Sequence, residues 1–380
     1  MRHRLFRTII VFGVLLQVSA VLGQLSTQDH LADPGFWPTQ SATSRGEFTG
    51  PQTCASCHAS KFASAQLTPM GSGAMMAETA QVLRSHPHLS FDVAHYHYAI
   101  HTGQNGSRYT VTDGQRTLSY DLTWAFGTAR VGQSYLFKNG EQFYEARVTY
   151  FDKLKNLGFT PDRDLLSPKD LAEAMYRPVG SAEIQRCFSC HTTASDINGS
   201  FDEAHLIPGV TCEACHGPGE KHVAAMNSAS VMPNASNAAI FNSAHLNPVE
   251  AVEFCGACHG SWWDVKLAGV KGVSTTRSAP YRLVTSKCWG KGDQRLECTA
   301  CHDPHAPLQT EAGPYDSACL NCHLRAPGET LSATHPGRAC TVATKNCTSC
   351  HMPKVYVPEM HDAFTDHRIR IVKAGAPFPE

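Results

Sequence analysis

The clearest hydrophobic–polar pattern lies between residues 90 and 152, where short strand-like runs are separated by turn dipeptides. Asn105-Gly106, Asp113-Gly114 and Asn139-Gly140 each favour a two-residue hairpin turn, because these residue types tolerate the positive φ angles of that turn. The runs between the turns are rich in β-branched and aromatic residues, which favour strands. The pattern predicts a haem-free antiparallel β insert over 90–165, with strands near residues 95–101, 109–111, 117–122, 134–137 and 142–150.

Polar and apolar residues alternate along the run from His95 to His101. In a strand, this period of two places His95, His97 and His101 on one face. Three histidines on one face could bind a metal ion. The alternative, which we favour, is an exposed sheet face with solvated histidines.

Residues 1–23 combine three arginines, an apolar run from Ile9 to Leu22 and small residues near position 20. This pattern predicts a secretory signal peptide. The run is shorter than the ~20 residues of a membrane-spanning helix, which disfavours the alternative of an uncleaved anchor. No later apolar run is long enough to span a membrane. We therefore expect a periplasmic or extracellular protein with no transmembrane segment after signal removal.

Fourteen of the sixteen cysteines belong to seven Cys-x-x-Cys-His pentads. In this pentad two thiols bond to the vinyl groups of a porphyrin and the adjacent histidine binds its iron, which is the attachment pattern of c-type haem. The sequence therefore predicts seven covalently attached haem c groups. In chain order the pentads, called motifs one to seven from here on, are Cys54/Cys57/His58, Cys187/Cys190/His191, Cys212/Cys215/His216, Cys255/Cys258/His259, Cys298/Cys301/His302, Cys319/Cys322/His323 and Cys347/Cys350/His351.

Zinc is the alternative for motifs five and six, whose cysteine pairs have the spacing of a zinc ribbon. A ribbon does not require a histidine directly after every pair. Only 21 of the 380 residues are histidine, so seven histidines at seven such positions do not arise by chance. Haem is therefore the favoured cofactor.

Each low-spin haem iron needs a second axial ligand, which in multihaem proteins is commonly a further histidine. Met70 follows motif one closely and could complete its haem, where a thioether would raise the reduction potential; core packing is the alternative role of this residue. The sequence does not say which ligand serves which haem, because distal ligands come from other segments of the fold. The candidates are His205, His222, His245, His305, His335, His361 and His367, with His86, His88 and the histidines of 95–101 in reserve.

The positions of the motifs divide the chain after the signal peptide. Residues 24–89 are expected to form an N-terminal arm with the first haem site, and residues 166–380 a six-haem cytochrome domain of short helices and loops. Ser167-Pro168-Lys169-Asp170 predicts the start of a helix that ends near Tyr176, with Ser167 as its cap and Pro168 in its first position. The expected fold class is a mainly α and irregular multihaem cytochrome c scaffold with an antiparallel β insert.

The formal charge of the chain is −1, which gives no basic signature for a nucleic-acid partner. Loss of the three arginines within residues 1–23 takes the charge to −4, and two propionates on each of seven haems bring it to about −18. The expected partners are redox proteins, cationic surfaces being favoured, with possible docking to a membrane electron-transfer complex.

Cys288 and Cys340 are the two cysteines outside the motifs. In an exported protein a leftover pair suggests a disulfide. Such a bond would tie the segment before motif five to the segment before motif seven.

In its pentads and in the histidines that follow them, the chain resembles a family of exported bacterial multihaem c-type cytochromes. This family is related to the tetrahaem electron-shuttle cytochromes of nitrifiers and to the octahaem hydroxylamine-oxidising group. The resemblance implies distal-ligand roles for His222 and His305, and also for His361 and His367. The matching text is Cys212-Glu-Ala-Cys215-His216-Gly-Pro-Gly-Glu-Lys-His222, Cys298-Thr-Ala-Cys301-His302-Asp-Pro-His305, Cys350-His351-Met-Pro-Lys354 and His361-Asp-Ala-Phe-Thr-Asp-His367-Arg-Ile-Arg370.

Three functions fit these observations. The main hypothesis is electron transfer along closely packed haems, whose potentials the protein sets through axial ligands, burial and hydrogen bonds. The second is an oxidoreductase acting on a small nitrogen or sulfur compound at one open haem, and the third is a cytochrome that assembles into a filament or conduit. The sequence contains no Cys-x-x-Cys-Lys motif, the form that nitrite reductases of this broad lineage often carry. This absence favours electron transfer over enzymatic activity.

Overall fold

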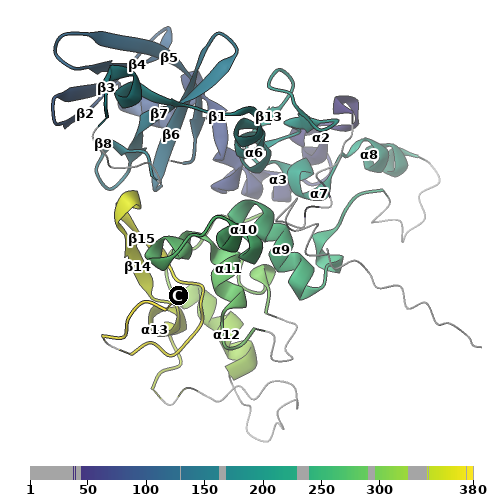
Figure 1. The fold of residues 1–380 in the computed structure, drawn as a ribbon. Helices are drawn as coiled ribbons and strands as arrows, with labels where there is room; N and C mark the ends of the chain where they lie inside the picture. Colours follow the sequence, from purple (N-terminus) through teal and green to yellow (C-terminus); the bar gives the residue numbers. More distant parts are fainter. Residues whose placement is uncertain are drawn as a thin grey trace, which may run out of the picture.

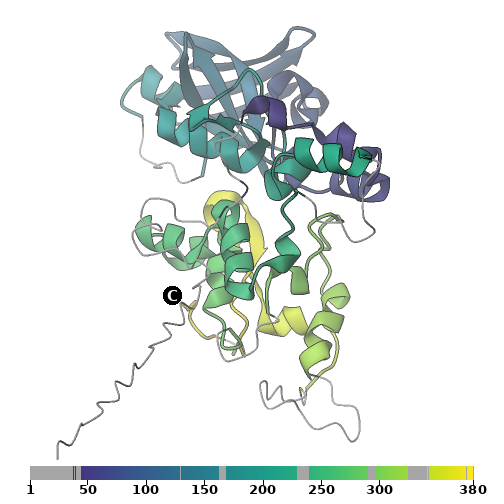
Figure 2. The same ribbon diagram turned by 90° about the vertical axis from the view of Figure 1, so that its right-hand side faces the viewer.

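The chain folds into two lobes in a computed structural model (Figures 1 and 2). The N-terminal lobe holds a large β-sheet and motifs one to three, and the C-terminal lobe holds motifs four to seven. The expected signal peptide, Ser167 and His335 lie outside the described residues. The structure describes residues 37, 39, 44–128, 130–161, 168–228, 239–289, 296–323, 340, 342–373 and 375–379.

The sheet of the N-terminal lobe is antiparallel, and seven of its strands pair in chain order. The chain reverses at all three predicted places, and Gly106, Gly114 and Gly140 adopt φ angles of 108°, 86° and 62°. The predicted dipeptides are not themselves the two-residue loops, because the residues between the paired strands are 104–105, 113–116 and 140–141. β1 pairs with β5, and β9 pairs with β7. The strands are β1 Ala74–Met76, β2 His88–Val93, β3 Tyr96–Gly103, β4 Gly106–Thr112, β5 Thr117–Phe126, β6 Gly132–Asn139, β7 Gln142–Phe151, β8 Asn156–Phe159 and β9 Tyr176–Pro178.

The sheet curls until its first and seventh main strands lie side by side, which makes it nearly a barrel (Figure 1). The Ser90 amide of β2 donates a hydrogen bond to Asn156 Oδ1 of β8 at 3.1 Å. Irregular register between β5 and β6, and between β6 and β7, adds the bends that such curling needs. The interior contains buried aromatic side chains, including Tyr98, Tyr109 and Tyr135. Their burial makes the interior of the sheet a packed core.

The histidines of the second and third strands lie on the outer face. His97 and His101 are exposed, whereas His95 belongs to the turn before β3 and not to the strand. His97 contacts Asp92 at 2.6 Å, and His101 contacts His88 through their Nδ1 atoms at 3.0 Å. Within the described part of the chain, no group of three or more His, Cys, Asp or Glu residues is arranged to hold a metal ion. The three-histidine metal site is therefore wrong, and the exposed-face alternative holds.

A short helix, α5 (Leu171–Met175), packs on the sheet and receives a hydrogen bond from Tyr109 Oη to the Met175 carbonyl at 3.0 Å. Asp170 is its cap and accepts from the Glu173 amide at 2.9 Å. The prediction of Pro168 inside the helix is wrong, because the capping carboxylate lies two residues further along. The end of the helix before Tyr176 agrees with expectation.

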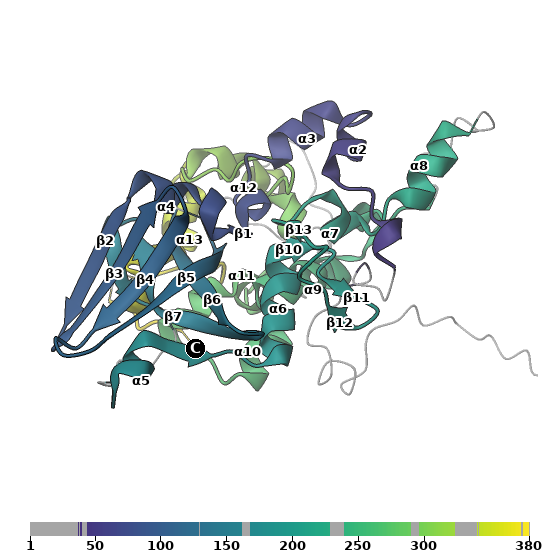
Figure 3. The same ribbon diagram turned by 90° about the horizontal axis from the view of Figure 1, so that it is seen from above.

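Most of the remaining helices of the N-terminal lobe are short and carry or flank the first three motifs, whereas those at 77–79 and 81–85 pack against the sheet. Figure 3 shows the sheet at one end of the molecule and α2, α3 and α8 toward the other. These elements are η1 Arg45–Glu47, α2 Pro51–Ala55, α3 Ala59–Ala65, η2 Met70–Ser72, η3 Ala77–Thr79, α4 Gln81–Ser85, α6 Ser181–His191, α7 Cys212–His216 and α8 Glu220–Asn227, with the two-residue strands β10 Thr192–Thr193, β11 Asp196–Ile197, β12 Ser200–Phe201 and β13 Ile207–Pro208.

The C-terminal lobe is built from short helices and one hairpin around a buried ion pair. Arg282 and Asp366 are both 0% exposed, with Arg282 Nε 2.8 Å from Asp366 Oδ1. The elements are η4 Ser243–His245, α9 Pro248–His259, α10 Trp262–Leu267, η5 Gly272–Arg277, α11 Ala279–Val284, η6 Cys298–Ala300, η7 Gly313–Tyr315, α12 Asp316–His323, α13 Cys347–His351, β14 Lys354–Val357, η8 Pro358–Met360 and β15 Asp362–Thr365.

The expected fold class needs one correction. The structure is 37% helix and 25% strand, so the chain is not mainly α. The sheet also extends beyond the predicted insert of 90–165, because it includes β1 and β9. No helix among the described residues combines the length and the apolar character needed to cross a bilayer.

Candidate haem-binding sites

Most motifs occupy the C-terminal end of a helix. The motif histidine is the last helical residue in α6, α7, α9, α12 and α13. On a helix, residues three apart lie on one face, so the two thiols of a pentad point to the same side and the histidine follows beside them. In motif one, Cys54 lies in α2 and His58 is the residue before α3. In motif five, η6 gives the same short turn.

Three motif histidines are held in the form that an iron ligand requires. Each places Nδ1 against a backbone carbonyl: His191 on Gly73 at 3.0 Å, His216 on Phe241 at 2.9 Å and His351 on Arg370 at 3.0 Å. A carbonyl only accepts, so Nδ1 carries the proton and Nε2 presents its lone pair to a metal. Burial also lowers the pKa of His191 and His302, which favours the neutral imidazole. The donor set therefore fits c-type haem.

Two candidate distal histidines lie opposite motif histidines. His305 and His216 have ring centres 6.0 Å apart and planes inclined by 11°; His367 and His302 have ring centres 6.2 Å apart and planes inclined by 41°. Two imidazoles that bind one metal ion from opposite sides have ring centres on the order of 6 Å apart, since each metal–nitrogen distance is about 2 Å. Both separations therefore suit an axial pair.

His367 also has the orientation of a ligand. Its Nδ1 donates to the Thr365 carbonyl at 3.0 Å, which leaves Nε2 free. Burial is the main cause of its lowered pKa, so the ring is a neutral donor. His305 lies near a carboxylate instead, with Nδ1 3.2 Å from Asp303 Oδ1. Second partners of this kind orient metal-binding histidines.

The other distal candidates have contacts outside the motifs. His205 is exposed and contacts Asp202 at 3.0 Å. His361 packs edge-on against Phe151 of the sheet with ring centres 4.7 Å apart. His222 lies half-buried in α8, and His245 is exposed at the end of η4. The ligand roles of these four residues stay predictions.

Met70 lies in η2, which contacts motif two. The Met70 carbonyl accepts from the Val210 amide at 3.0 Å, and Gly73, at the end of the same turn, accepts from His191. The loop that follows motif one in the sequence therefore supports the histidine of motif two. Ligation of the motif-one haem by Met70 stays a prediction.

The motif cysteines lie next to one another across motif boundaries. Four pairs of thiols are immediate neighbours, and the proximity of Cys54 lowers the pKa of Cys212 to about 7. Together the neighbours link motifs one, three, four, five, six and seven in series, and motif two joins at motif four. The immediate neighbours are Cys54/Cys212, Cys190/Cys258, Cys255/Cys298 and Cys319/Cys347, and three further pairs are near enough to affect each other's ionisation, Cys215/Cys255, Cys215/Cys258 and Cys301/Cys319.

The other four motif cysteines are not placed beside a cysteine of another motif by the described residues. Cys57 and Cys350 are exposed, and each thiol lies beside the hydroxyl of the serine that precedes it, at 3.8 and 3.9 Å. Burial raises the pKa of Cys187 to about 11. The side chain of Cys322 lies outside what the structure describes, so the place of motif six in the series depends on Cys319. Haem attachment through these four cysteines, as through the other motif cysteines, stays a prediction.

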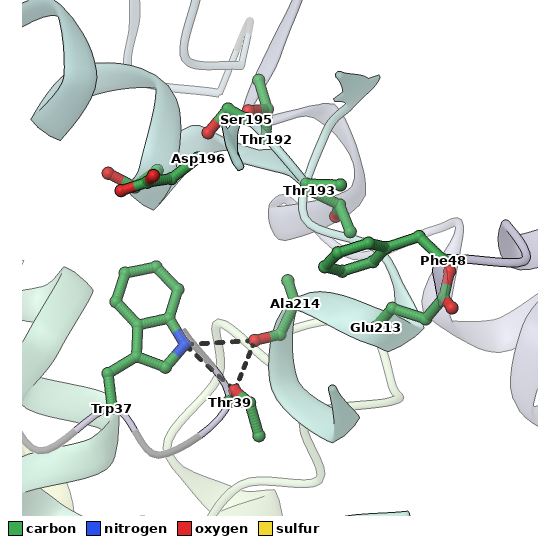
Figure 4. A pocket seen from close by; sticks show the side chains of 11 residues that line it. Trp37, Thr39, Phe48, Thr192, Thr193, Ser195, Asp196, Glu213 and Ala214 are labelled. Carbon is green, nitrogen blue, oxygen red and sulfur yellow. Dashed lines mark hydrogen bonds between the residues drawn. The ribbon is translucent and has the colours of Figure 1, made fainter. Parts of the chain in front are cut away.

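A small polar cavity separates motifs two and three (Figure 4). Its volume is about 40 Å³, which suits water and not a porphyrin. Trp37 closes one side by donating through Nε1 to the Ala214 carbonyl at 3.2 Å. Asp196 and Glu213 lie on its wall, and Asp196 Oδ1 is buried without a hydrogen-bond partner among the described residues. The N-terminal arm therefore covers motif three.

Sequence reasoning missed the residues that support the motifs. The carbonyls of Gly73, Phe241 and Arg370 act through their backbone, so residue type gives no signal for them. Glu213 could have been noticed, because it lies within motif three and is 2% exposed. A carboxylate beside two haem cysteines is a feature that composition alone does not explain.

The predicted disulfide between Cys288 and Cys340 is wrong. Both cysteines are described, and neither forms a disulfide. Cys340 is exposed, and its pKa is lowered by hydrogen bonds from the backbone amides of Ala343 and Val342. Its thiol is therefore presented to solvent in a partly activated form.

Alkylation of the unreduced holoprotein is expected to label Cys340, because an exposed thiol of lowered pKa reacts readily. Peptide mass spectrometry locates the label, and Cys340→Ser should remove it. If no thiol reacts until a reductant is added, the two cysteines are linked in the mature protein and the disulfide prediction is restored.

Comparison with known proteins gives one family match and one structural likeness. Residues 165–217 match the family described as "Cytochrome c554 and c-prime"; this segment contains motifs two and three. A solved structure, "Crystal Structure of Outer Cell Wall Cytochrome OcwA", is similar over 85% of this chain and 80% of that chain, with a TM-score of 0.48 and 13% identity. A comparison with curated proteins finds no match. The family match supports c-type haem attachment at motifs two and three.

Proposed function

We propose that this chain is a seven-haem c-type cytochrome that carries electrons in the periplasm or at the cell surface. The family match supports haem c at two motifs, and the same pentad recurs at five further places. Haem bound at the motifs supplies reversible one-electron chemistry of iron. The chain provides the attachment thiols, the axial imidazoles and the polar contacts that orient them.

The observation that carries this proposal is the series of neighbouring motif cysteines. Cys54 lies against Cys212, Cys215 lies beside Cys255, and Cys255 lies against Cys298. Since each thiol marks the edge of its porphyrin, haems attached at these motifs are neighbours too. Motif four touches motifs two, three and five, so it joins the two lobes and forms a branch point. Such a series is what electron relay between distant surfaces requires.

Axial pairs at motifs three and five favour transfer over catalysis. An iron with two imidazole ligands offers no open position to a substrate. His216 with His305 and His302 with His367 have the separation of such pairs. An acidic holoprotein would exchange electrons with redox proteins that present cationic surfaces.

Seven covalent haems are expected per chain after expression with the complete maturation machinery. Intact mass, together with the ratio of haem to protein, measures this number. The spectrum of the oxidised protein should contain low-spin features alone. Six or fewer haems would remove at least one motif from the proposal, and a high-spin haem that binds nitrite or hydroxylamine would replace electron transfer with the oxidoreductase hypothesis.

A further inference from the structure

Glu213 is a buried carboxylate between the two cysteines of motif three. Its side chain accepts backbone hydrogen bonds from Thr49 and Gly219 to Oε1 and from Gly50 to Oε2, each at 2.8 Å. All three partners donate, which is the pattern of an ionised carboxylate. The side chain is only 2% exposed, so solvent screens its charge weakly.

No cation pairs with Glu213 among the residues that the structure describes. Asp366, the other buried acid among the described residues, contacts Arg282 at 2.8 Å and Arg370 at 2.5 Å. Backbone amides satisfy the hydrogen bonds of Glu213, but they are neutral and leave its full charge in place. The fit around the carboxylate is tight, since a Cβ at Gly219 would lie 3.1 Å from Glu213 Oε1. The fold is thus built closely around an uncompensated anion.

The charge lies between two haem motifs. Thr49 and Gly50 precede α2, which carries Cys54, and α2 contacts α7, where Cys212 lies beside Glu213. The field of the carboxylate acts on both thiols, opposing the ionisation of each. One buried negative charge therefore acts on the attachment points of motif one and motif three together.

We propose that Glu213 is a positioning residue whose fixed negative charge lowers the reduction potentials of the haems at motifs one and three. A nearby anion stabilises ferric iron over ferrous iron, because the oxidised centre carries one more positive charge. The inference rests on the proposed function. It makes the two haems the low-potential end of the series, so an electron delivered there by a redox protein moves toward motif four. This order is the reverse of that expected from Met70 as a ligand at motif one.

The test is a spectroelectrochemical titration of holoprotein carrying Glu213→Gln, with all seven haem potentials resolved. Two potentials are expected to rise while five stay in place. Glu213→Asp keeps the charge and should leave the two potentials low. Glu220→Gln is the matched control, since it removes one negative charge from an exposed position in the first turn of α8, and it should move no potential appreciably.

Each outcome decides the inference. Equal shifts in Glu213→Gln and Glu213→Asp would assign the effect to packing and overturn the role of the charge, as would an unchanged Glu213→Gln titration. If Glu213→Gln does not accumulate as holoprotein, the haem potentials of the parent protein are titrated at increasing salt concentration instead. A buried charge is screened weakly, so the potentials of the haems at motifs one and three should stay low as salt rises. A rise of all seven potentials together would overturn the proposal. A chain without seven haems fails the stoichiometry measurement instead, so failure of the proposed function is recognised separately.

Discussion

Replacing His367 with alanine is expected to convert one of the seven haems from low spin to high spin. In the parent structure His367 lies opposite His302 with ring centres 6.2 Å apart, and its Nδ1 proton is held by the Thr365 carbonyl. Loss of the imidazole leaves the iron at motif five with one protein ligand. The oxidised spectrum should gain a high-spin band of about one-seventh of the haem, and the reduced protein should bind one equivalent of carbon monoxide.

A second ligand variant and a control variant accompany this experiment. His305→Ala should open the haem of motif three in the same way, because the ring centre of His305 lies 6.0 Å from that of His216. His97→Ala is the control: His97 is exposed on the haem-free sheet and contacts Asp92 at 2.6 Å, so its loss should leave every haem low spin. A His367→Ala protein that is spectrally identical to the parent would show that another residue serves motif five.

The second large effect is on stability. Asp366→Asn is expected to reduce the free energy of unfolding of the C-terminal lobe by about 3–5 kcal/mol, the usual cost of leaving a buried charge without its partner. Arg282 and Asp366 are both fully buried and joined by contacts of 2.8 and 3.0 Å. The neutral amide of the variant would leave the Arg282 guanidinium uncompensated. Chemical denaturation followed by the haem absorbance measures the loss.

The matched control is a surface ion pair of similar geometry. Arg108 and Asp121 lie 2.9 Å apart on the sheet, but both side chains are more than half exposed. Asp121→Asn should therefore cost less than about 1 kcal/mol. Equal losses in the two variants would show that burial of the Arg282–Asp366 pair contributes nothing.

The same ion pair makes the stability of the folded protein depend on pH in the acidic range. Burial opposes ionisation of Asp366, but hydrogen bonds from Arg282 and the Arg368 amide prevail and lower its pKa below the ordinary value of 3.8. A depressed pKa in the folded state means that the contribution is fully present above about pH 4 and is lost as pH falls through the folded value. Because His367 follows Asp366 directly, the haem of motif five should be the first to change its spectrum in acid.

The sequence predicted those parts of the fold that local chemistry determines. The three turn dipeptides mark where the hairpins lie, and their glycines adopt positive φ angles, although the loops themselves are residues 104–105, 113–116 and 140–141. Most pentads lie on short helices, where two thiols three residues apart share one face. The observed α5 begins three residues after the predicted start, because serine and aspartate are both favoured at helix caps and Asp170 is the cap that the structure shows.

The distal ligands could be proposed as a set but not assigned. His305 lies 89 positions from His216 in the numbering, and His367 lies 65 from His302, so no local pattern connects the members of either pair. The role of the Met70 loop was hidden for the same reason. Its contact with motif two is made by the Gly73 carbonyl, and a backbone carbonyl has no sequence signature.

The near closure of the sheet limits how copies of this protein could assemble. An open sheet would expose two rows of unpaired amides and carbonyls, which recruit strands from other molecules. Here β2 and β8 lie side by side, with the Ser90 amide already donating to Asn156. Growth of a fibre by strand addition is therefore disfavoured at the sheet. End-to-end contacts in a conductive assembly are instead expected at the helical surfaces that carry the motifs.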